Sequence, residues 1–413
     1  MSIISKDVVI IGGGPAGLAA AITLYKKGIT NIIILEREKR LGGILKQCIH
    51  EGFGLTRFQE TLSGPEYANR FIEEVEELSI PYITEATVIH LTKDKTVIAA
   101  SAKGILEYRA KAVILAMGCR ERTRGAISIP GTRPAGIYNA GVAQAYINLD
   151  NKMVGKEVVI LGSGDIGMIM ARRLTLEGAK VKAVFEIQPY PSGLPRNIEQ
   201  CLNDYQIPLY LSHTITNIKG RARVEAVTVA QVDETFNIIP GTEKEFTCDT
   251  LILSVGLIPE NELSLEAGVE LDNRTKGAFV DENYQTSIEG IFAAGNVLQV
   301  HDLVDFVSLE AENMAEAVIA YIKENSLTSC SLKVETDGSI LYTVPQRISA
   351  TRDFKLYFRV RRPMKDCEIQ LRQNNRIIKT IKKKKALPAE MIQIPVSCSK
   401  LVPDANLEVV IQC

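Results

Sequence analysis

The chain has 413 residues, which is enough for two or three domains. Hydrophobic residues make up 46% and charged residues 23%, as in a globular protein with a sizeable core. The 48 lysines and arginines are balanced by 49 aspartates and glutamates, so we expect no nucleic-acid partner. The start, MSIISKDVVIIGGG, lacks the pattern of a secretion signal, and the apolar runs are shorter than the roughly 18 residues of a membrane span. We therefore expect a cytoplasmic protein without a membrane span.

Residues 7–36 are predicted to form a strand, a glycine-rich turn, a helix and a second strand. Gly12, Gly14 and Gly17 follow the pattern G-x-G-x-x-G, which permits a tight turn, the approach of a pyrophosphate and close packing of the helix. The helix N-terminus offers free N–H groups and a positive dipole end to phosphates. Glu36 ends the second strand, where a carboxylate accepts hydrogen bonds from a ribose. This stretch predicts a dinucleotide-binding fold.

The glycine pattern returns in residues 157–186, and Glu186 follows its middle glycine by 22 residues, the same spacing as in the first copy. Two copies with the same spacing predict two dinucleotide-binding folds. A carboxylate at Glu186 suits a ribose 2′-OH and repels a 2′-phosphate, and the next arginine, Arg196, lies ten residues on. We therefore expect NADH rather than NADPH. The alternative is that Glu186 only ends a strand at the surface.

Three further segments lie in the order of a known architecture. They are AVILAMG, TLILSVGLIPENEL and TSIEGIFAAGNV, which end or connect predicted strands. With the two glycine patterns they resemble the pyridine nucleotide–disulfide oxidoreductase superfamily over residues 6–325. The resemblance implies an α/β fold with two Rossmann-like domains. The FAD domain is expected over 1–122 and 264–328, with an NAD(P)H domain inserted at 123–263.

The resemblance also implies which residues bind each cofactor. The expected FAD-binding residues are Gly12, Gly14, Pro15, Ala16, Gly17, Glu36, Arg37, Gly43, Val88, Ala116, Gly118, Gly295 and Asn296. The expected NAD-binding residues are Gly162, Gly164, Asp165, Ile166, Glu186 and Gly256. Asn296 stands where the family usually has an aspartate, and an amide still accepts one hydrogen bond and donates another. None of the eight cysteines forms a CxxC pair, so no metal site is expected.

The loop LGGILKQCIH, residues 41–50, departs from the superfamily. In its disulfide reductases this loop reads GG-x-C-x4-C, and the two cysteine positions correspond here to Leu45 and His50, with Cys48 between them. A redox disulfide requires two adjacent cysteines, so we do not expect a lipoamide, glutathione or thioredoxin reductase. Three interpretations remain: Cys48 is a single redox thiolate, His50 exchanges protons beside the flavin, or the loop serves packing alone.

A narrower resemblance rests on LGGILKQCIHEGFGL, LSGPEYANRF, MGCRERTRGAISIPGTRPAGIYNAGVAQ and FEIQPYPSGLPRN. These segments are similar to a bacterial subfamily related to the large subunits of sarcosine oxidase, opine oxidase and hydrogen cyanide synthase. Close relatives are encoded beside an anaerobic glycerol-3-phosphate dehydrogenase and a small Cys-rich protein. The resemblance implies that the chain passes electrons between NAD(H) and such a flavoprotein dehydrogenase.

The last third of the chain contains a predicted helix and then a change of pattern. Apolar spacing predicts a helix from about 307 to 322, and His301 and Asp302 just before it lie either near the flavin or in a surface loop. Residues 329–413 alternate apolar and polar with period two, which predicts a small antiparallel β-sandwich domain. We expect this domain to be appended, so that the rest folds without it. The lysines at 382–385 are typical of a solvated edge, and docking of an acidic partner is the alternative.

These features favour an FAD-dependent NADH:acceptor oxidoreductase that lacks a redox disulfide. A self-contained NADH oxidase or peroxidase that uses Cys48 is the second hypothesis. The third is a non-catalytic, FAD-stabilised scaffold whose β domain binds partner subunits.

Overall fold

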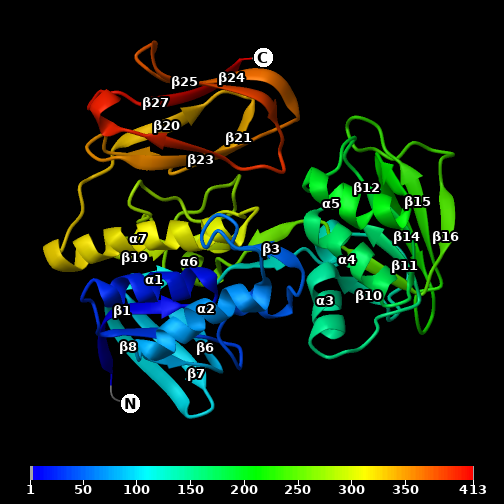
Figure 1. Ribbon diagram of the computed structural model, residues 1–413, viewed down its shortest axis with the longest axis horizontal. Coiled ribbons are helices and arrows are strands. Elements are labelled where there is room, and N and C mark those ends of the chain that lie inside the picture. The colour runs from blue at the N-terminus through cyan, green and yellow to red at the C-terminus, as the bar shows by residue number, and fades with distance from the viewer. Residues whose placement is uncertain (1–2, 413) are drawn as a thin grey trace. The chain divides into compact units, whose positions relative to one another are not determined.

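The computed structural model describes residues 3–412, which divide into two compact units (Figure 1). Unit 1 comprises Met1–Cys119 and Pro259–Cys413, and unit 2 comprises Arg120–Ile258. The two strands at the crossings, β9 (Cys119–Glu121) and β18 (Leu257–Pro259), form a two-stranded ladder. The C-terminal strands fall within unit 1 instead of forming a third unit.

Unit 1 is built on a seven-stranded sheet whose order is β5-β2-β1-β8-β7-β6, with β19 beside β8. β1, β2, β5, β8 and β19 run parallel, and β6 and β7 form an antiparallel extension. The run from Val8 to Ile11 is at most 4% exposed, because helices and loops cover both faces of the sheet. The strands are β1 (Ile4–Ile11), β2 (Ile32–Leu35), β5 (Tyr82–Ile83), β6 (Ala86–Leu91), β7 (Thr96–Ser101), β8 (Gly104–Leu115) and β19 (Ile291–Ala293).

The helices of unit 1 bring two distant parts of the chain together. α1 has Pro15 at its first position, where a missing N–H costs nothing, and α1 lies beside α7 (Figure 1). α7 spans 21 residues, longer at both ends than the predicted helix at 307–322. The bounds are α1 (Pro15–Lys26), α2 (Gly64–Glu77), α6 (Glu262–Glu266) and α7 (Val304–Glu324), and the small hairpin consists of β3 (Glu51–Phe53) and β4 (Leu62–Ser63).

Unit 2 contains a parallel sheet in the order β10-β17-β11-β12-β13 and an antiparallel sheet β14-β15-β16. Alternate residues of β11 enter two different cores, with Val158 and Ile160 in one and Val159 and Leu161 in the other. The elements are β10 (Ile137–Asn139), α3 (Ala140–Asn148), β11 (Glu157–Leu161), α4 (Asp165–Leu176), β12 (Lys180–Glu186), α5 (Pro195–Cys201), β13 (Leu209–Leu211), β14 (His213–Lys219), β15 (Ala226–Gln231), β16 (Lys244–Thr247) and β17 (Thr250–Leu253).

Residues 332–412, called here the C-terminal strand region, form two sheets that share one hydrophobic core. The orders are β22-β20-β27-β24-β25 and β21-β23-β26. Their alternating apolar side chains fill the space between the sheets. The strands are β20 (Leu332–Thr336), β21 (Ile340–Val344), β22 (Arg347–Ile348), β23 (Phe354–Val360), β24 (Met364–Gln373), β25 (Arg376–Ala386), β26 (Ile392–Val396) and β27 (Leu407–Gln412).

The C-terminal strand region is attached to the rest of unit 1 by packing as well as by polar contacts. Tyr342, Val344 and Tyr357 belong to the same buried cluster as the sheet strands β1 and β8. Arg359 on β23 pairs with Asp302, and the other carboxylate oxygen of Asp302 accepts the N–H of Met391 at 2.6 Å. The expectation of a freely appended domain is therefore not supported, because this region completes the core of unit 1.

Across residues 3–412, no helix combines the length and apolar character that a membrane span requires. The same part of the chain contains no group of three or more His, Cys, Asp or Glu side chains arranged to hold a metal ion.

Candidate functional site

The first glycine-rich turn is shaped by close backbone approaches between β1 and α1. A Cβ atom on Gly17 would lie 1.9 Å from the carbonyl oxygen of Gly12, so only glycine permits this packing. Gly12 has a φ of +108°, and a Cβ there would lie 2.3 Å from the carbonyl oxygen of Ala116. At Gly14, which caps α1, the nearest neighbour of such an atom is Cα of Gly43 at 3.8 Å. The turn is thus closed toward the sheet and open where a pyrophosphate is expected, which fits a dinucleotide.

Glu36 lies where β2 ends and is 5% exposed. Its Oε2 accepts the N–H of Gly13 at 2.7 Å, and its Oε1 accepts the N–H of Glu38 at 2.8 Å. Each carboxylate oxygen has a further lone pair that suits a ribose hydroxyl. The strand that carries Val88 begins beside this acid, since the N–H of Ala86 donates to the carbonyl of Glu36 at 2.9 Å. By contrast, the side chain of Arg37 is 60% exposed and lies 4.0 Å from Glu38.

The segment after β19 lies against the end of β8, which carries Ala116 and Gly118. The N–H of Ala294 donates to the carbonyl of Leu115 at 3.2 Å. Asn296 uses both functions of its amide: Oδ1 accepts the N–H of His301 at 3.0 Å, and Nδ2 lies 3.6 Å from Sγ of Cys119. The amide that replaces the usual aspartate therefore shapes its own loop.

Beneath this segment lies a buried cluster around Glu310 that no sequence motif singled out. The Glu310 carboxylate is fully buried and accepts the N–H of Gly295 at 2.8 Å and Nε2 of Gln299 at 2.7 Å. Nε2 of His301 lies 3.1 Å from the same carboxylate, and the His301 ring has an edge contact with Tyr357. His301 is 9% exposed, so its interpretation as part of a surface loop is wrong. The available signal was a glutamate on the apolar face of the predicted helix.

The loop after Glu36 contains both predicted catalytic residues. Cys48 is 7% exposed, its Sγ donates to the carbonyl of Ile44 at 3.5 Å, and burial raises the pKa of its thiol to about 12. A thiol with this pKa is protonated at neutral pH, which disfavours a redox thiolate. His50 is half-buried, with its ring 4.9 Å from that of Phe53 and its Nδ1 3.1 Å from the carbonyl of Glu51.

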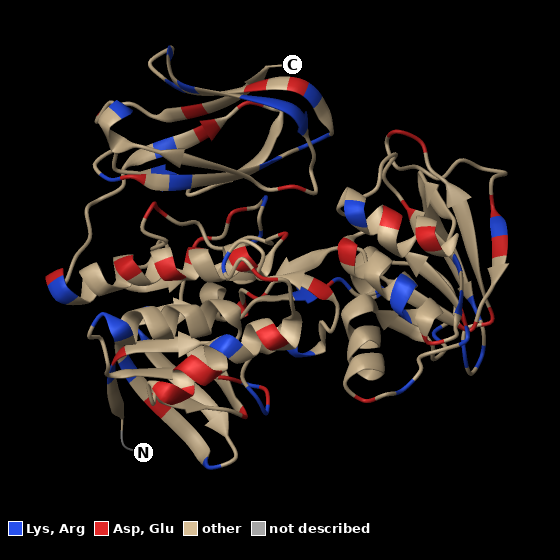
Figure 2. Cartoon of the chain, viewed as in Figure 1, with Lys and Arg blue, Asp and Glu red and all other residues tan. Residues whose placement is uncertain are grey.

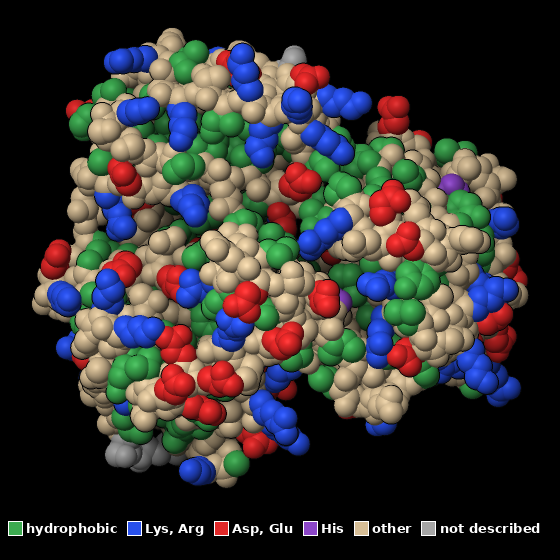
Figure 3. All heavy atoms as spheres, viewed as in Figure 1, with side chains coloured by type: hydrophobic (Ala, Val, Ile, Leu, Met, Phe, Trp, Pro, Cys, Tyr) green, Lys and Arg blue, Asp and Glu red, His purple; other side chains and the backbone are tan. Residues whose placement is uncertain are grey.

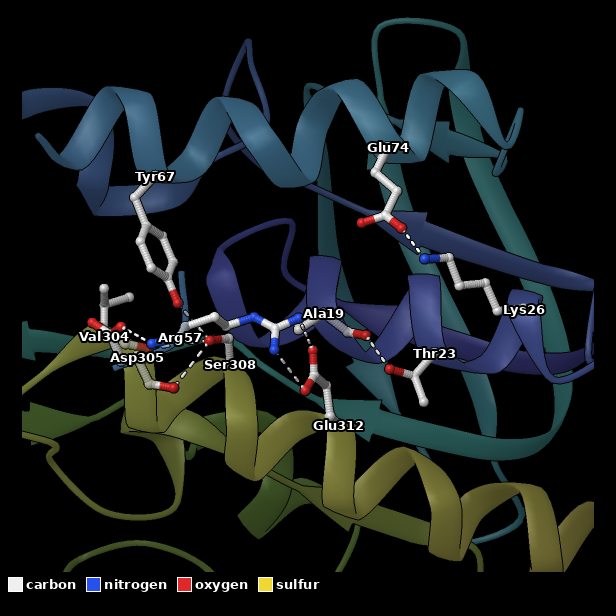
Figure 4. A network of polar contacts seen from close by, with 10 residues as sticks. All are labelled: Ala19, Thr23, Lys26, Arg57, Tyr67, Glu74, Val304, Asp305, Ser308 and Glu312. Carbon is white, nitrogen blue, oxygen red and sulfur yellow. Dashed lines mark hydrogen bonds and ion pairs between the residues drawn. The ribbon is translucent and has the colours of Figure 1, made fainter. Parts of the chain in front are cut away.

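Asp305 in the first turn of α7 holds the end of this loop (Figure 4). The carboxylate is 1% exposed and accepts three backbone N–H groups: Gly54 at 3.0 Å, Thr56 at 3.1 Å and Arg57 at 2.8 Å. These donors are separated from Asp305 by about 250 residues in the chain, as the 251-residue separation from Gly54 illustrates. The geometry of residues 54–57 is therefore fixed by the start of α7.

Two side-chain contacts extend the attachment along α7 (Figure 4). The hydroxyl groups of Tyr67 on α2 and Ser308 on α7 lie 2.5 Å apart. Arg57 donates to Glu312 at 3.1 Å and also stacks over the Phe58 and Phe71 rings. Burial raises the pKa of the Tyr67 phenol above its usual range, so the phenol remains protonated and can donate.

In unit 2 the second glycine-rich turn joins β11 to α4, with Gly162 and Gly164 before the helix. Asp165 is the first residue of α4, but its Oδ1 accepts the N–H of Leu194 at 2.8 Å and Nδ2 of Asn197 at 2.7 Å. The Asp165 carboxylate thus holds the start of α5. Only the backbone N–H groups of Asp165 and Ile166 remain for a phosphate, as the predicted roles require.

Glu186, at the end of β12, is 4% exposed, so its interpretation as a surface residue is wrong. Its Oε2 accepts the N–H of Ser163 at 2.9 Å, the Ser163 hydroxyl at 2.7 Å and the Ser192 hydroxyl at 2.8 Å. Its Oε1 accepts only the N–H of Gln188, at 3.0 Å. Oε1 is therefore the freer oxygen for a ribose. Gly256 lies just after β17, and its carbonyl accepts the N–H of Arg122 at 3.0 Å.

Comparison with known proteins relates this architecture to one family. The family model described as pyridine nucleotide-disulphide oxidoreductase matches residues 6–321. A thioredoxin reductase of Peptoclostridium litorale is 30% identical over 322 residues, which cover 77% of this chain and 97% of the relative. One of the opine oxidase subunits of Agrobacterium tumefaciens is 28% identical over 318 residues, and the match covers 70% of this chain and 61% of that relative.

Among solved structures, Lactococcus lactis thioredoxin reductase superposes with a TM-score of 0.63 at 22% identity, covering 77% of this chain and 99% of that one. This likeness shows a mixed α/β fold of the thioredoxin reductase type. No helix of the described residues was found that could span a membrane, and the strands beyond residue 321 lie outside the family match. The chain belongs to the pyridine nucleotide-disulphide oxidoreductase family, which consists of flavin-dependent pyridine nucleotide oxidoreductases.

Proposed function

We propose that the protein is an FAD-dependent NADH:acceptor oxidoreductase that works without a redox disulfide. The observation that carries the proposal is the same local geometry in both units. In each, a buried glutamate at a strand end accepts the N–H of the residue after the first glycine, 2.7 Å for Glu36 and 2.9 Å for Glu186. This arrangement is typical of dinucleotide-binding turns, so each unit is suited to one nucleotide.

FAD is assigned to unit 1 and NADH to unit 2, in line with the expected domains at 1–122 with 264–328 and at 123–263. The first turn, Glu36 and the segment at Gly295 would hold FAD. Glu186 and the start of α4 would hold NADH. Bound FAD supplies the chemistry of hydride acceptance and electron release. The chain contributes position, through backbone N–H groups and buried carboxylates, and it excludes water by its packed core.

The acceptor is proposed to be another protein or a small oxidant, because no disulfide joins any two of the described cysteines and the sequence has no CxxC pair. This distinguishes the chain from a dithiol enzyme even though some of its relatives are thioredoxin reductases. By resemblance, the proposed redox partners are a flavoprotein dehydrogenase and a small Cys-rich protein. That one relative is named for its place in an opine oxidase of several subunits supports a role within a complex.

An oxidase or peroxidase that uses Cys48 is less favoured, because the raised thiol pKa works against a thiolate. A non-catalytic scaffold is less favoured because both acidic residues are kept in the binding geometry. Steady NADH consumption with dioxygen or peroxide as acceptor would support the oxidase, and failure of NADH to reduce the flavin would support the scaffold.

The first test uses stopped-flow absorbance on the purified protein, which is expected to be yellow from noncovalently bound FAD. NADH should bleach the flavin faster than NADPH, because Glu186 repels a 2′-phosphate. Glu186→Gln should reduce this preference at least about fivefold, while Glu177→Gln, on the surface of the same unit, should leave it unchanged. A clear preference of the unaltered protein for NADPH contradicts the assignment. Absence of bound flavin contradicts the proposed function itself.

A further inference from the structure

The C-terminal strand region differs in charge from the rest of the chain. Residues 330–413 contain 16 Lys and Arg against 8 Asp and Glu, whereas residues 1–329 contain 32 against 41. The near-zero net charge of the chain therefore conceals a basic region joined to an acidic remainder. The region also lies outside the family match at 6–321. An added basic segment on a flavoprotein core is suited to an interaction role.

The excess positive charge is concentrated at one end of β24 and β25 (Figure 2). The register places Lys365 opposite Lys385 and Glu368 opposite Lys382. Seven cations at this end face two acids, Asp366 and Glu368, and within residues 3–412 none of the seven forms an ion pair. The seven are Arg361, Arg362, Lys365, Lys382, Lys383, Lys384 and Lys385, and Figure 3 shows basic side chains spread over the visible face of this region.

β25 is also an open edge. It spans 11 residues, Arg376–Ala386, and in the described part of the chain it pairs with β24 alone. Half of its backbone N–H and C=O groups therefore face away from the sheet without a strand partner. Ile377 on this edge is 50% exposed. An edge of this kind is a template for an added strand.

We propose that the free edge of β25 docks an acidic, extended segment of a partner protein, which adds a strand and places its carboxylates against Lys382–Lys385. Side chains alternate between the two faces of a strand, so Lys382 and Lys384 point to one face and Lys383 and Lys385 to the other. A strand whose carboxylates also alternate reaches both pairs, whereas a flat membrane surface meets only one. A second copy of the chain brings the same positive strand against itself. Prevention of aggregation explains lysines on β25 but not Arg361, Arg362 and Lys365.

This docking site does not rest on the proposed chemistry, since binding is measured without NADH. The probe is a fluorescein-labelled ten-residue peptide in which glutamate alternates with threonine, titrated by anisotropy against the full-length protein. We expect saturable binding that weakens with added salt. K382E/K384E and K383E/K385E should each weaken it at least about tenfold. The matched control K333E/K400E, which reverses two exposed lysines of the same region away from β25, should bind like the unaltered protein.

A second peptide tests the strand geometry. It has the same sequence, but alternate backbone nitrogens are methylated, which removes hydrogen-bond donors from the edge that faces β25, and we expect it to bind at least about tenfold more weakly. Equal binding of both peptides overturns strand addition. Binding to phosphatidylserine vesicles in place of the peptide, or salt-sensitive dimers in sedimentation, overturns the choice of occupant. Thermal unfolding of each variant checks folding, and K382Q/K384Q replaces any variant that does not fold.

Discussion

At the residue scale, the loop at 41–50 separates two residues that look equally chemical in the sequence. Cys48 is buried against the start of α2, since a Cβ on Gly64 would lie 2.8 Å from Cβ of Cys48, and its thiol pKa is raised to about 12 by burial. His50 is half-buried and titrates near neutrality in its ordinary state. The role of His50 remains a prediction, and that of Cys48 is better explained by packing.

Cys48→Ser is expected to leave NADH-driven flavin reduction and transfer to an artificial acceptor nearly unchanged, because a protonated thiol takes no part in either. His50→Ala should slow reoxidation more than reduction, by up to about 10²-fold if its imidazole exchanges protons there. Stopped-flow measurement of the two half-reactions separates these effects. Iodoacetamide at pH 8 should label Cys48 much more slowly in the folded than in the unfolded protein. Loss of turnover in Cys48→Ser with a silent His50→Ala reverses the ranking.

At the element scale, α7 organises the candidate flavin site through carboxylates on its buried face. Asp305 holds residues 54–57, and Glu310 holds Gly295 and the segment that follows. Each carboxylate satisfies backbone N–H groups that would otherwise be buried without acceptors. The helix therefore fixes both the loop that contains His50 and the segment that contains Asn296.

Asp305→Asn keeps the size of the side chain but replaces one accepting oxygen with an NH2 group. At least one of the N–H groups of Gly54, Thr56 and Arg57 then loses its acceptor, which is expected to cost about 1–3 kcal/mol of unfolding free energy. Urea denaturation measures the loss, and hydrogen exchange should show faster exchange at these amides. Glu316→Gln on the same helix, whose exposed pair with Lys27 is worth little, should be neutral. Equal stability of the two variants contradicts the attachment.

At the scale of the whole molecule, the C-terminal strand region is both an extension of the family fold and part of its core. Tyr342, Val344 and Tyr357 pack into the cluster that contains β1 and β8. Gln346 accepts the N–H of Val280 at 2.9 Å, and Asp302 is paired with Arg359. Removal of this region would expose apolar surface and leave these polar groups without partners.

Deletion of residues 330–413 is therefore expected to lower the thermal midpoint of unfolding by more than about 5 °C and to weaken flavin retention. Differential scanning fluorimetry and the ratio of flavin to protein absorbance after gel filtration report the two effects. Arg359→Met, which leaves Asp302 half-paired without removing any strand, should produce a smaller change in the same direction. A truncated protein as stable and as yellow as the full chain would restore the view of an appended domain.

The sequence by itself determined the two dinucleotide-binding turns, because their geometry depends on glycines and a glutamate at fixed local spacing. It also indicated the strands after residue 330, whose period of two is a local property. Only the tertiary structure decided that Asp305 holds the loop at Gly54, across 251 residues, and that Arg359 pairs with Asp302 across 57. Likewise, the burial that raises the pKa of Cys48 arises from packing against α2, which no local pattern encodes. Contacts between distant segments depend on the whole fold, and local spacing carries no information about them.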